Sequence, residues 1–403
     1  MKKLLVIPSL CALFLSAGFA VQPALAAENL PAQAKVQMPA PDGKLPPMLK
    51  DGKRPPLPPR FRGPQLSNAE AAAKLQNSYG YSYSAMLKLL SAGHSYGELN
   101  EACLYAYLSG APVEKVLQLR QPATWGRVKM QLGLTPKVYT EKYMQYQASY
   151  LPADSSVDRA TALKYLKQGY PLSDILQAGK LAQKSGKTVA EILPLRTVTC
   201  DWAQVEEKLG LSAKQEGKPS MGRGQRSGAG FAGLHTKDMT KERAVRIFHA
   251  DYLFDEAELG RLYDKYGFND TEDICLVAYM AKKPLAEVEG LRDKYSWERM
   301  KYVLGLTPEI YFNRCVDYQA RRLEERMDIP QKVTKKYMHM GYAMHHINSA
   351  YLLAQKAGMD ISEVIDLKTP KNSWSTVAAK IGVSEADCQW MKDKISKDFG
   401  RHE

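Results

Sequence analysis

A tryptophan followed eight residues later by a glycine occurs four times in this chain, and this recurrence constrains the fold more than any other feature. The shift along the sequence that carries Trp125 onto Trp297 also carries Trp202 onto Trp374, so the copies form two matched pairs. Recurrence at a fixed spacing is typical of repeat proteins, in which each repeat is one supersecondary unit. The sequence therefore predicts four versions of one structural unit. The pairs are Trp125/Gly133, Trp202/Gly210, Trp297/Gly305 and Trp374/Gly382.

The similarity extends well beyond the tryptophans. Under the shift from Trp125 to Trp297, which we call the long shift, segments 103–148 and 275–320 share twenty identical residues out of 46 without a gap. A weaker similarity, which we call the short shift, relates the segment that starts at Gly93 to the one that starts at Gly169. These two periods predict two homologous halves of about 150 residues, 67–213 and 239–397, each with two sub-repeats.

Apolar residues within each copy follow a helical spacing. Leu99, Cys103 and Ala106 recur at steps of four and three, and Trp125 is followed at similar steps by Val128 and Leu132. This period is that of an amphipathic helix, and no stretch of the chain shows the sustained alternation of a half-buried strand. We therefore expect an all-α fold of tandem helical repeats, in which packed copies share a core. The helical step from each tryptophan to the apolar residues that follow it favours a place in this core over a surface platform that stacks on sugars or bases.

Glycines and small hydroxyl residues mark the predicted helix boundaries. Ser67, Ser95 and Ser173 are expected to begin helices as N-caps. Thr135 and Thr307, each followed by proline, are expected to restart a helix after the tryptophan helix. Glycine ends helices at low cost because it adopts a left-handed conformation readily. Beyond the four glycines paired with tryptophans, the predicted helix ends are Gly93, Gly110, Gly169, Gly186, Gly341 and Gly358.

Segments of different composition flank the two halves. Residues 1–26 begin with Met-Lys-Lys, continue with an apolar run and end in small residues, which is the pattern of a secretory signal peptide. We therefore expect cleavage near Ala26 and an exported product, periplasmic or secreted, without a transmembrane segment. Residues 27–66 are basic and rich in proline, which favours an extended, disordered tether. Residues 214–238 are glycine-rich and basic, which predicts a linker between the halves.

The chain is strongly basic, with a formal net charge of +13. A basic exported protein is expected to associate with anionic material such as lipid head groups or acidic wall polymers. The same charge also has a simpler interpretation, namely solubility. Five of the six cysteines lie beyond the signal peptide, in no C-x-x-C pattern, so we predict buried thiols and no zinc or redox site.

A basic residue precedes the tryptophan in every copy. A ladder of cations with the repeat spacing could bind an anionic polymer. The structural alternative, which we favour, is a cation near a helix C-terminus, where it interacts with the free carbonyl groups. The four candidates for anion binding are Arg120, Arg196, Arg292 and Lys368.

One further group of residues suggests a metal site. Thioethers and imidazoles are ligands for copper, and imidazoles also bind nickel and zinc. However, Met338 and Met344 occupy core-like positions, where the second copy has leucine, and His345 and His346 replace Ser173 and Asp174, which are expected at the surface or in a cap. The candidate ligands are Met338, His339, Met340, Met344, His345 and His346.

The sequence contains none of the linear motifs of enzymes. A nucleophile elbow, a zincin helix, a phosphate loop and a dinucleotide turn are absent, so we assign no catalytic residue and no cofactor. An enzyme that uses scattered carboxylates stays open, because paired acids leave no fixed spacing in the sequence. The segment from Trp374 to Ser384 is similar to part of a helix-turn-helix reader, but only this copy has a small residue, Ala378, where the helices would cross. Nucleic acid is therefore not the expected partner.

The repeat resembles those of uncharacterised exported bacterial proteins. The similar elements are Gly-Tyr followed by an acidic residue, spaced alanines before Ser-Gly, a Val-x-Glu-Ile-Leu-like stretch and the tryptophan–glycine pair, and they are clearest from Gly169 to Gly210. The resemblance implies an all-helical fold and an envelope location, and no activity. We therefore expect a non-enzymatic binding or scaffolding protein that contacts an anionic envelope component or another envelope protein. The alternatives are an envelope enzyme with a site between the halves and a periplasmic metal-handling protein.

Overall fold

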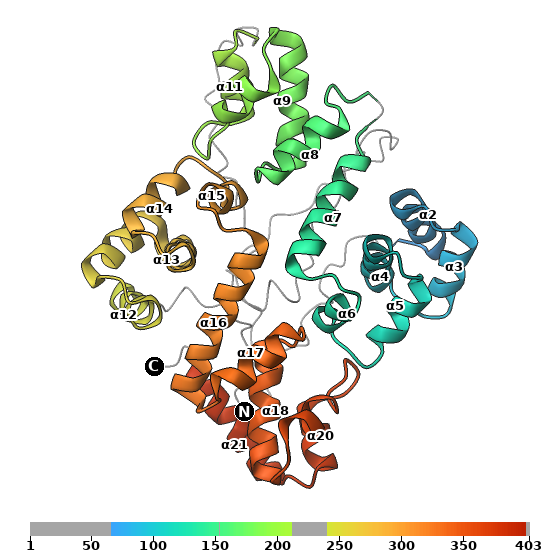
Figure 1. The fold of residues 1–403 in the computed structure, drawn as a ribbon, viewed down its shortest axis with the longest axis vertical. Coiled ribbons are helices and arrows are strands. Elements are labelled where there is room, and N and C mark those ends of the chain that lie inside the picture. Colours follow the sequence, from blue (N-terminus) through green and yellow to red (C-terminus); the bar gives the residue numbers. More distant parts are fainter. Residues whose placement is uncertain (1–65, 153, 212–239, 400–403) are drawn as a thin grey trace, which may run out of the picture. The chain divides into compact units, whose positions relative to one another are not determined.

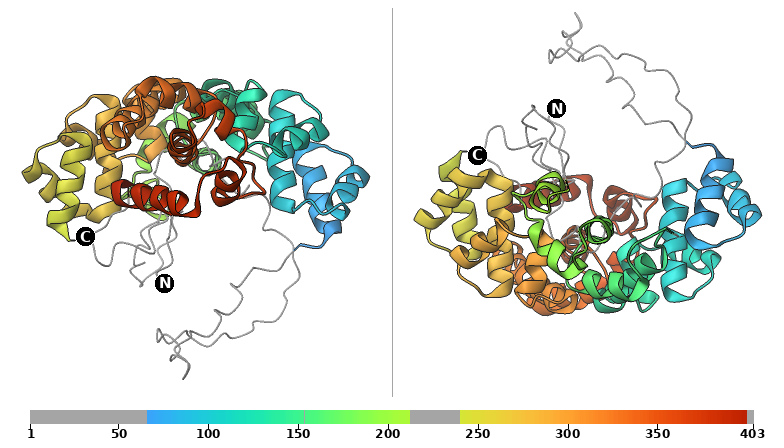
Figure 2. Two further views of the ribbon diagram at one scale, coloured as in Figure 1. Left: turned by 90° about the horizontal axis from the view of Figure 1, so that it is seen from below. Right: turned by 90° about the horizontal axis from the view of Figure 1, so that it is seen from above.

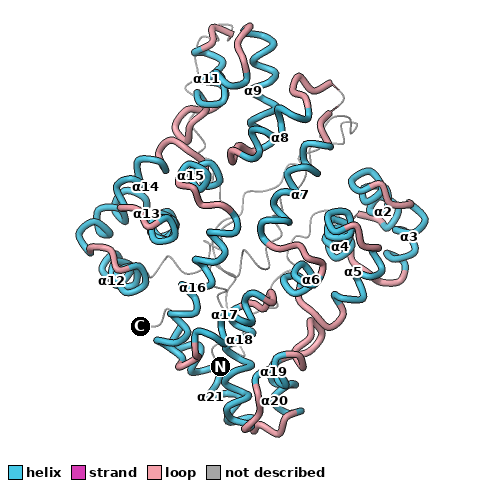
Figure 3. Tube along the Cα trace, in the orientation of Figure 1, coloured by secondary structure: helices cyan, strands magenta, loops and turns pink. Residues whose placement is uncertain are grey.

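The computed structural model describes residues 66–152, 154–211 and 240–399, and in these ranges the chain forms helices and no strands (Figures 1 and 3). The predicted all-α fold is thus confirmed. The expected signal peptide, nearly all of the tether and the linker at 214–238 lie outside the described residues. Among the described helices, none is long and apolar enough to cross a membrane.

The described residues divide into two compact units, 66–107 and 108–399. The smaller unit holds α2 (Asn68–Tyr79), α3 (Tyr83–Ser91) and most of α4 (Tyr96–Ser109). Ser67 and Glu70 form the predicted capping box, in which each side chain accepts a hydrogen bond from the backbone N–H of the other residue. Cys103 is fully buried in this unit, and its thiol lies 3.5 Å from the sulfur of Met86.

The larger unit consists of short helices joined by tight turns. In chain order they are α5 (Val113–Arg120), α6 (Trp125–Gln131), α7 (Pro136–Ser149), α8 (Arg159–Lys167), α9 (Leu172–Ser185), α10 (Val189–Ile192) with a 3₁₀ turn (Leu193–Leu195), α11 (Trp202–Lys208), α12 (Lys241–Tyr252), α13 (Glu256–Ala281), α14 (Leu285–Arg292), α15 (Trp297–Val303), α16 (Pro308–Met327), α17 (Gln331–His339), α18 (Met344–Ala357), α19 (Ile361–Ile365), α20 (Trp374–Lys380) and α21 (Glu385–Phe399).

Each of the four tryptophans is the first residue of a short helix, namely α6, α11, α15 or α20. We expected these helices to stop at the paired glycines, and each glycine lies exposed in the turn that closes its helix, two residues after the last helical residue. The predicted helix ends are therefore confirmed to within two residues. The glycines concerned are Gly133, Gly210, Gly305 and Gly382.

Hydrogen bonds in this turn explain the position of the glycine. In the first copy the N–H of Gly133 donates to the carbonyl of Met130 at 3.0 Å, and the N–H of Leu134 donates to that of Lys129 at 2.8 Å. This pair of bonds is the Schellman motif, in which the residue after the C-cap is left-handed. The four paired glycines have a φ of 69° to 75° accordingly. The motif thus specifies one local structure, a two-turn helix closed by a left-handed glycine.

The predicted helix starts are confirmed at Thr135 and Thr307, whose side chains accept from the backbone N–H three residues later. Ser95 also accepts from the N–H of Glu98. The prediction is wrong at Ser173, because α9 begins at Leu172 with Pro171 as its N-cap, two residues before the predicted N-cap. Proline has its φ fixed near the value required there, and Ser173 then lies inside the first turn.

The third copy has no glycine at one of its helix ends. Where the first copy has Gly110, the equivalent residue is Lys282, which adopts a φ of 57° without being glycine. Earlier in the same copy, α13 contains a kink at Gly267, where φ is 74° and ψ is −173°. A lysine in the left-handed region is strained, because its Cβ approaches the following carbonyl oxygen.

Among the described residues of the larger unit, apolar clusters form in the second, third and fourth copies, and residues at equivalent positions are buried in them. Ile175 and Ala178 in the second copy, Ile274 in the third, and Ile347 and Ala350 in the fourth are all fully buried. The alanines among them allow neighbouring helices to approach closely. The five cysteines in the described part of the chain are buried as thiols, as predicted.

The four tryptophans are only partly buried, although we expected core residues. Trp202, Trp297 and Trp374 pack against the clusters of their copies without being fully enclosed. An indole is apolar on its faces and carries one N–H donor, so a position at the edge of the core lets the ring pack while this donor meets a polar group. The expected burial was therefore wrong in degree, because the rings are only partly enclosed.

Two equivalent contacts connect the first half of the chain to the second. The helix α7 packs against α16, which is its equivalent under the long shift (Figures 1 and 2). An ideal Cβ on Gly341 would overlap the carbonyl oxygen of Gly126, at the start of α6. A Cβ on Gly169 would overlap the carbonyl oxygen of Glu298, at the start of α15. Both glycines are thus required by backbone contacts across the halves, as well as by their left-handed φ.

We predict that Gly341→Ala destabilises the protein more than Gly358→Ala. Both glycines have a positive φ, but Gly358 has open space where a Cβ would lie. Gly358→Ala should lower the free energy of unfolding by about 1–2 kcal/mol through backbone strain alone. Gly341→Ala should add about 1–3 kcal/mol because the methyl group overlaps the backbone of Gly126. Urea denaturation of both variants measures the difference, and equal losses would contradict the contact.

We also predict that Lys282→Gly stabilises the protein, because the substitution relieves left-handed strain at the end of α13. The expected gain in the free energy of unfolding is about 0.5–1 kcal/mol, measured by urea denaturation. Lys283→Gly, in the next residue, is the control and should give no gain, since Lys283 has no positive φ.

Candidate functional site

A polar residue, a cation and the tryptophan meet in three copies of the larger unit, and we call this arrangement the tryptophan niche. The polar residue comes from α9, α13 or α18, and the cation comes from the end of the short helix that precedes the tryptophan or from the turn after it. The polar residues occupy equivalent positions under the long and short shifts. The three niches are Asp174/Arg196/Trp202, Asp270/Arg292/Trp297 and His346/Lys368/Trp374.

In the second copy the niche is held together by hydrogen bonds. The indole Nε1 of Trp202 donates to Oδ1 of Asp174 at 3.2 Å. Burial raises the pKa of Asp174, while the bond from Trp202 and the charge of Arg196 oppose this effect. The carboxylate therefore fixes the orientation of the ring at the edge of the core.

In the third copy the cation and the acid pair directly. Arg292 Nη2 lies 3.2 Å from Oδ2 of Asp270, and its guanidinium carbon is 4.7 Å from the ring centroid of Trp297. Arg292 is only 9% exposed. The same stacking occurs in the first copy, where the guanidinium of Arg120 lies 4.9 Å from the ring of Trp125. Cation–π contacts of this kind favour a fixed ring position.

In the fourth copy a histidine replaces the acid. The ring of His346 lies 5.9 Å from that of Trp374 in an edge-on orientation and 4.2 Å from that of His345. Burial lowers the pKa of both imidazoles, and the neighbouring His345 and Lys368 help to lower that of His346 to about 3. Both rings are thus neutral at neutral pH. Our expectation of surface or cap positions was wrong here, because the first turn of α18 packs against the core and leaves both histidines half-buried.

The cations of the predicted basic ladder donate hydrogen bonds to groups of the protein itself. Arg120 Nη1 donates to the carbonyl of Ala123 at 2.6 Å, and Arg196 Nη1 donates to that of Cys200 at 2.9 Å. Lys368 Nζ donates to the carbonyls of Thr369 and Asn372, each at 2.7 Å. These carbonyls belong to the loop before the tryptophan helix. The cations therefore hold this loop in place. We expected them to interact with the free carbonyl groups at a helix C-terminus instead.

The methionines and histidines of the candidate metal site are not brought together as one set. Met338 and Met344 are buried in the core of the fourth copy, as their positions predicted, whereas His339 and Met340 are exposed. Only His345 and His346 form a close pair. Within the described ranges, no three His, Cys, Asp or Glu side chains form a group that could hold a metal ion.

Asp273 is a titratable group that the sequence interpretation missed. It lies one turn after Asp270 on α13, and burial, with help from Glu272 and Asp270, raises its pKa to about 7. Arg292 and Lys301 partly oppose this shift. A carboxyl with a pKa near 7 can act as an acid or a base at neutral pH. The repeat could have indicated this position, because the equivalent residues Glu101 and Gln177 are also polar on an apolar helix face.

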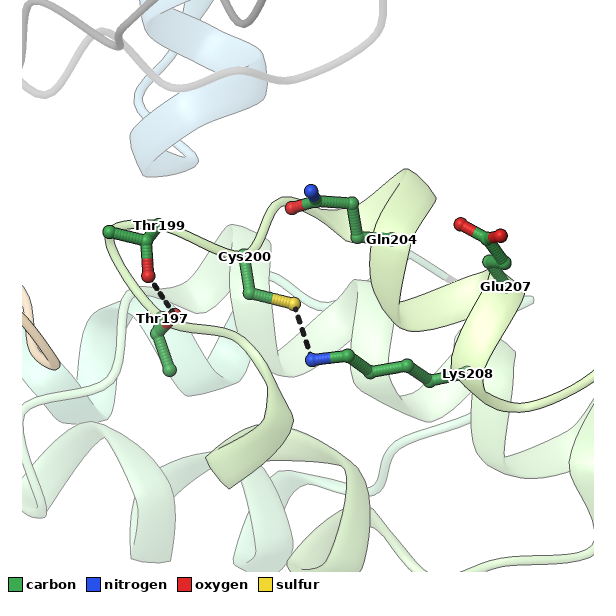
Figure 4. A pocket seen from close by; sticks show the side chains of 6 residues that line it. All are labelled: Thr197, Thr199, Cys200, Gln204, Glu207 and Lys208. Carbon is green, nitrogen blue, oxygen red and sulfur yellow. Dashed lines mark hydrogen bonds between the residues drawn. The ribbon is translucent and has the colours of Figure 1, made fainter.

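A shallow depression next to α11 contains a thiol and an ammonium group (Figure 4). Lys208 Nζ donates to Sγ of Cys200 at 3.2 Å, and Cys200 is 7% exposed. The other copies have Ala123, Tyr295 and Asn372 at this position, so the pair is specific to the second copy. The residues that line the depression are Thr197, Thr199, Cys200, Gln204, Glu207 and Lys208.

No model of a protein family matches the chain, and no curated protein is significantly similar to it in sequence.

We predict that the neutral histidines make the fold sensitive to mild acid. Below a pH of about 6.5, the ordinary pKa of histidine, the unfolded chain binds protons that the folded niche excludes. Stability is therefore complete above this pH and falls as the pH decreases towards the folded pKa of His346, about 3. Between pH 7 and pH 5, His346 should account for a loss of about 2 kcal/mol in the free energy of unfolding.

Urea denaturation at several pH values measures this loss. His346→Asn should remove a large part of it, whereas His339→Asn, at an exposed position of the same segment, should leave it unchanged. An identical pH dependence in all three proteins would contradict the assignment.

Proposed function

We propose that the protein is an exported, non-enzymatic scaffold that binds an anionic component of the cell envelope. The observation that carries the proposal is the basic composition of the chain, because the polar groups of the tryptophan niche, Asp174, Asp270 and His346, contact groups of the protein itself. The repeated helical framework supports a scaffold, since helical-repeat proteins use extended surfaces for binding. The basic composition, with a net charge of +13, favours an anionic partner.

The proposal does not depend on the four basic repeat positions as the anion-binding groups. Three of them, Arg120, Arg196 and Lys368, donate to carbonyls of their own loops, and Arg292 pairs with Asp270. The attraction to an anionic surface is then a property of the whole charge distribution. Such attraction is long-range and weakens with salt.

Binding of the mature protein to envelope extract at two salt concentrations tests this function. We expect capture of anionic wall polymer or lipid at low salt and a steep loss at high salt. Lys368→Gln should reduce stability while leaving the salt dependence nearly unchanged, because this cation is occupied by the loop. Capture that does not respond to salt, or no capture at all, would contradict the proposal.

An enzyme is the second candidate, and Asp273 is the observation that favours it. Incubation of the protein with envelope polymers, followed by analysis of released products, tests this function. Turnover that disappears in Asp273→Asn, at unchanged stability, would support an enzyme over a scaffold.

Metal handling is the third candidate, narrowed to the imidazole pair of His345 and His346, since neutral imidazole is the form that binds metal ions. Equilibrium dialysis against copper and nickel tests it, with the exposed His339→Asn as the control. Binding that survives the double substitution of His345 and His346 by asparagine would exclude this pair.

A further inference from the structure

The two contacts between the halves are copies of each other. In one contact, the guanidinium of Arg127 on α6 lies 4.3 Å from the ring of Tyr342 and 2.8 Å from a carboxylate oxygen of Asp366. In the other, the guanidinium of Arg299 on α15 lies 4.5 Å from the ring of Tyr170. Arg127 and Arg299 are equivalent under the long shift, and so are Tyr170 and Tyr342.

The glycines before these tyrosines complete the equivalence. Gly341 and Gly169 each pack against the backbone of the residue that precedes the docking arginine. Each half therefore carries both surfaces, an arginine on its first tryptophan helix and a Gly-Tyr turn in its second copy. An interface in which both partners present the same two surfaces is self-complementary, as in a twofold-symmetric dimer.

The second half offers the docking arginine a carboxylate, and the first half does not. Asp366 accepts from Arg127 and from the hydroxyl of Tyr342, whereas the equivalent residue of the first half is Pro194. Arg299 finds a backbone acceptor instead and donates from Nη1 to the carbonyl of Gln168 at 2.8 Å. The two contacts share one geometry but differ in charge.

We propose that a second copy of this chain is a partner of the protein, and that two chains associate by exchanging halves. In the exchanged dimer, Arg127 of one chain docks on Tyr342 and Asp366 of the other, and Arg299 docks on Tyr170 in the same way. The contacts described here between the halves of a single chain are then preserved between two chains, which is the condition for domain swapping. The balance between the forms depends on protein concentration relative to the effective concentration of the attached half.

The chain connectivity allows this exchange. The helix α11 ends at Lys208 and α12 begins at Lys241, so the two halves are far apart along the sequence. A fully extended chain of roughly 30 residues, which is the length of this separation, spans up to about 100 Å. The covalent connection therefore sets no short limit on the distance between the halves of one chain.

Charge exchange between two variants provides the test. Arg127→Asp places two carboxylates together at the contact, and Asp366→Arg places two guanidinium groups together. When the two variants are mixed, exchanged dimers pair Asp at 127 with Arg at 366 in one contact and keep the native Arg127–Asp366 pair in the other. The double variant, with both substitutions in one chain, restores opposite charges within a single chain and serves as the matched control.

Size-exclusion chromatography with light scattering, after a common incubation in mild urea and refolding at about 0.1 mM protein, gives the molecular mass. We expect a single-chain mass for each variant alone and for the double variant, and a twofold larger mass for the mixture. A mixture that keeps the single-chain mass would overturn the proposal, provided that circular dichroism shows both variants to be helical.

If either variant fails to fold, a second experiment with the wild-type chain provides the test. Two populations with different affinity tags are mixed, incubated in mild urea and refolded together. Capture on one tag should recover the other tag in an amount that rises with protein concentration and falls in Gly341→Ala. Absence of the second tag at every concentration would overturn the proposal.

Discussion

The backbone contact at Gly169 and Gly341 is the constraint on which the larger unit depends. At each of these positions a side chain as small as a methyl group would overlap a carbonyl of the opposite half. The close approach brings the arginine that follows this carbonyl, Arg127 or Arg299, onto the ring of the next tyrosine. A close backbone approach and an arginine–tyrosine contact thus occur together at two equivalent places. The helix α7 packs against α16 in the same unit.

The tryptophan niches show how one framework can diverge without losing its fold. The ring, its helix and the closing glycine are the same in each copy, because they fix the packing and the turn. The polar neighbour changes from Asp174, which accepts from the indole, to Asp270, which pairs with a cation, and to His346, which is neutral. The niche thus combines a constant edge of the core with a polar group that differs between copies.

The local structure was predictable from sequence, whereas the distant contacts were not. The tryptophan–glycine spacing predicted four helices and the turns that close them, since helix capping depends on residues within one or two turns. The start of α9 at Leu172 was missed because Pro171 and Ser173 are both acceptable near a helix start. The partial burial of His346 and the docking of Arg127 on Tyr342 depend on residues that are far apart in the chain. The repeat identifies these positions as equivalent, but it does not say what each one touches.

The most direct test of the reciprocal contact is a double-mutant cycle between Arg127 and Tyr342. The free energy of unfolding is measured for the wild type, for Arg127→Ala, for Tyr342→Leu and for the double variant by urea denaturation. If the guanidinium rests on the ring as described, the two substitutions are coupled by about 1 kcal/mol. Additive effects, with a coupling energy near zero, would contradict the account.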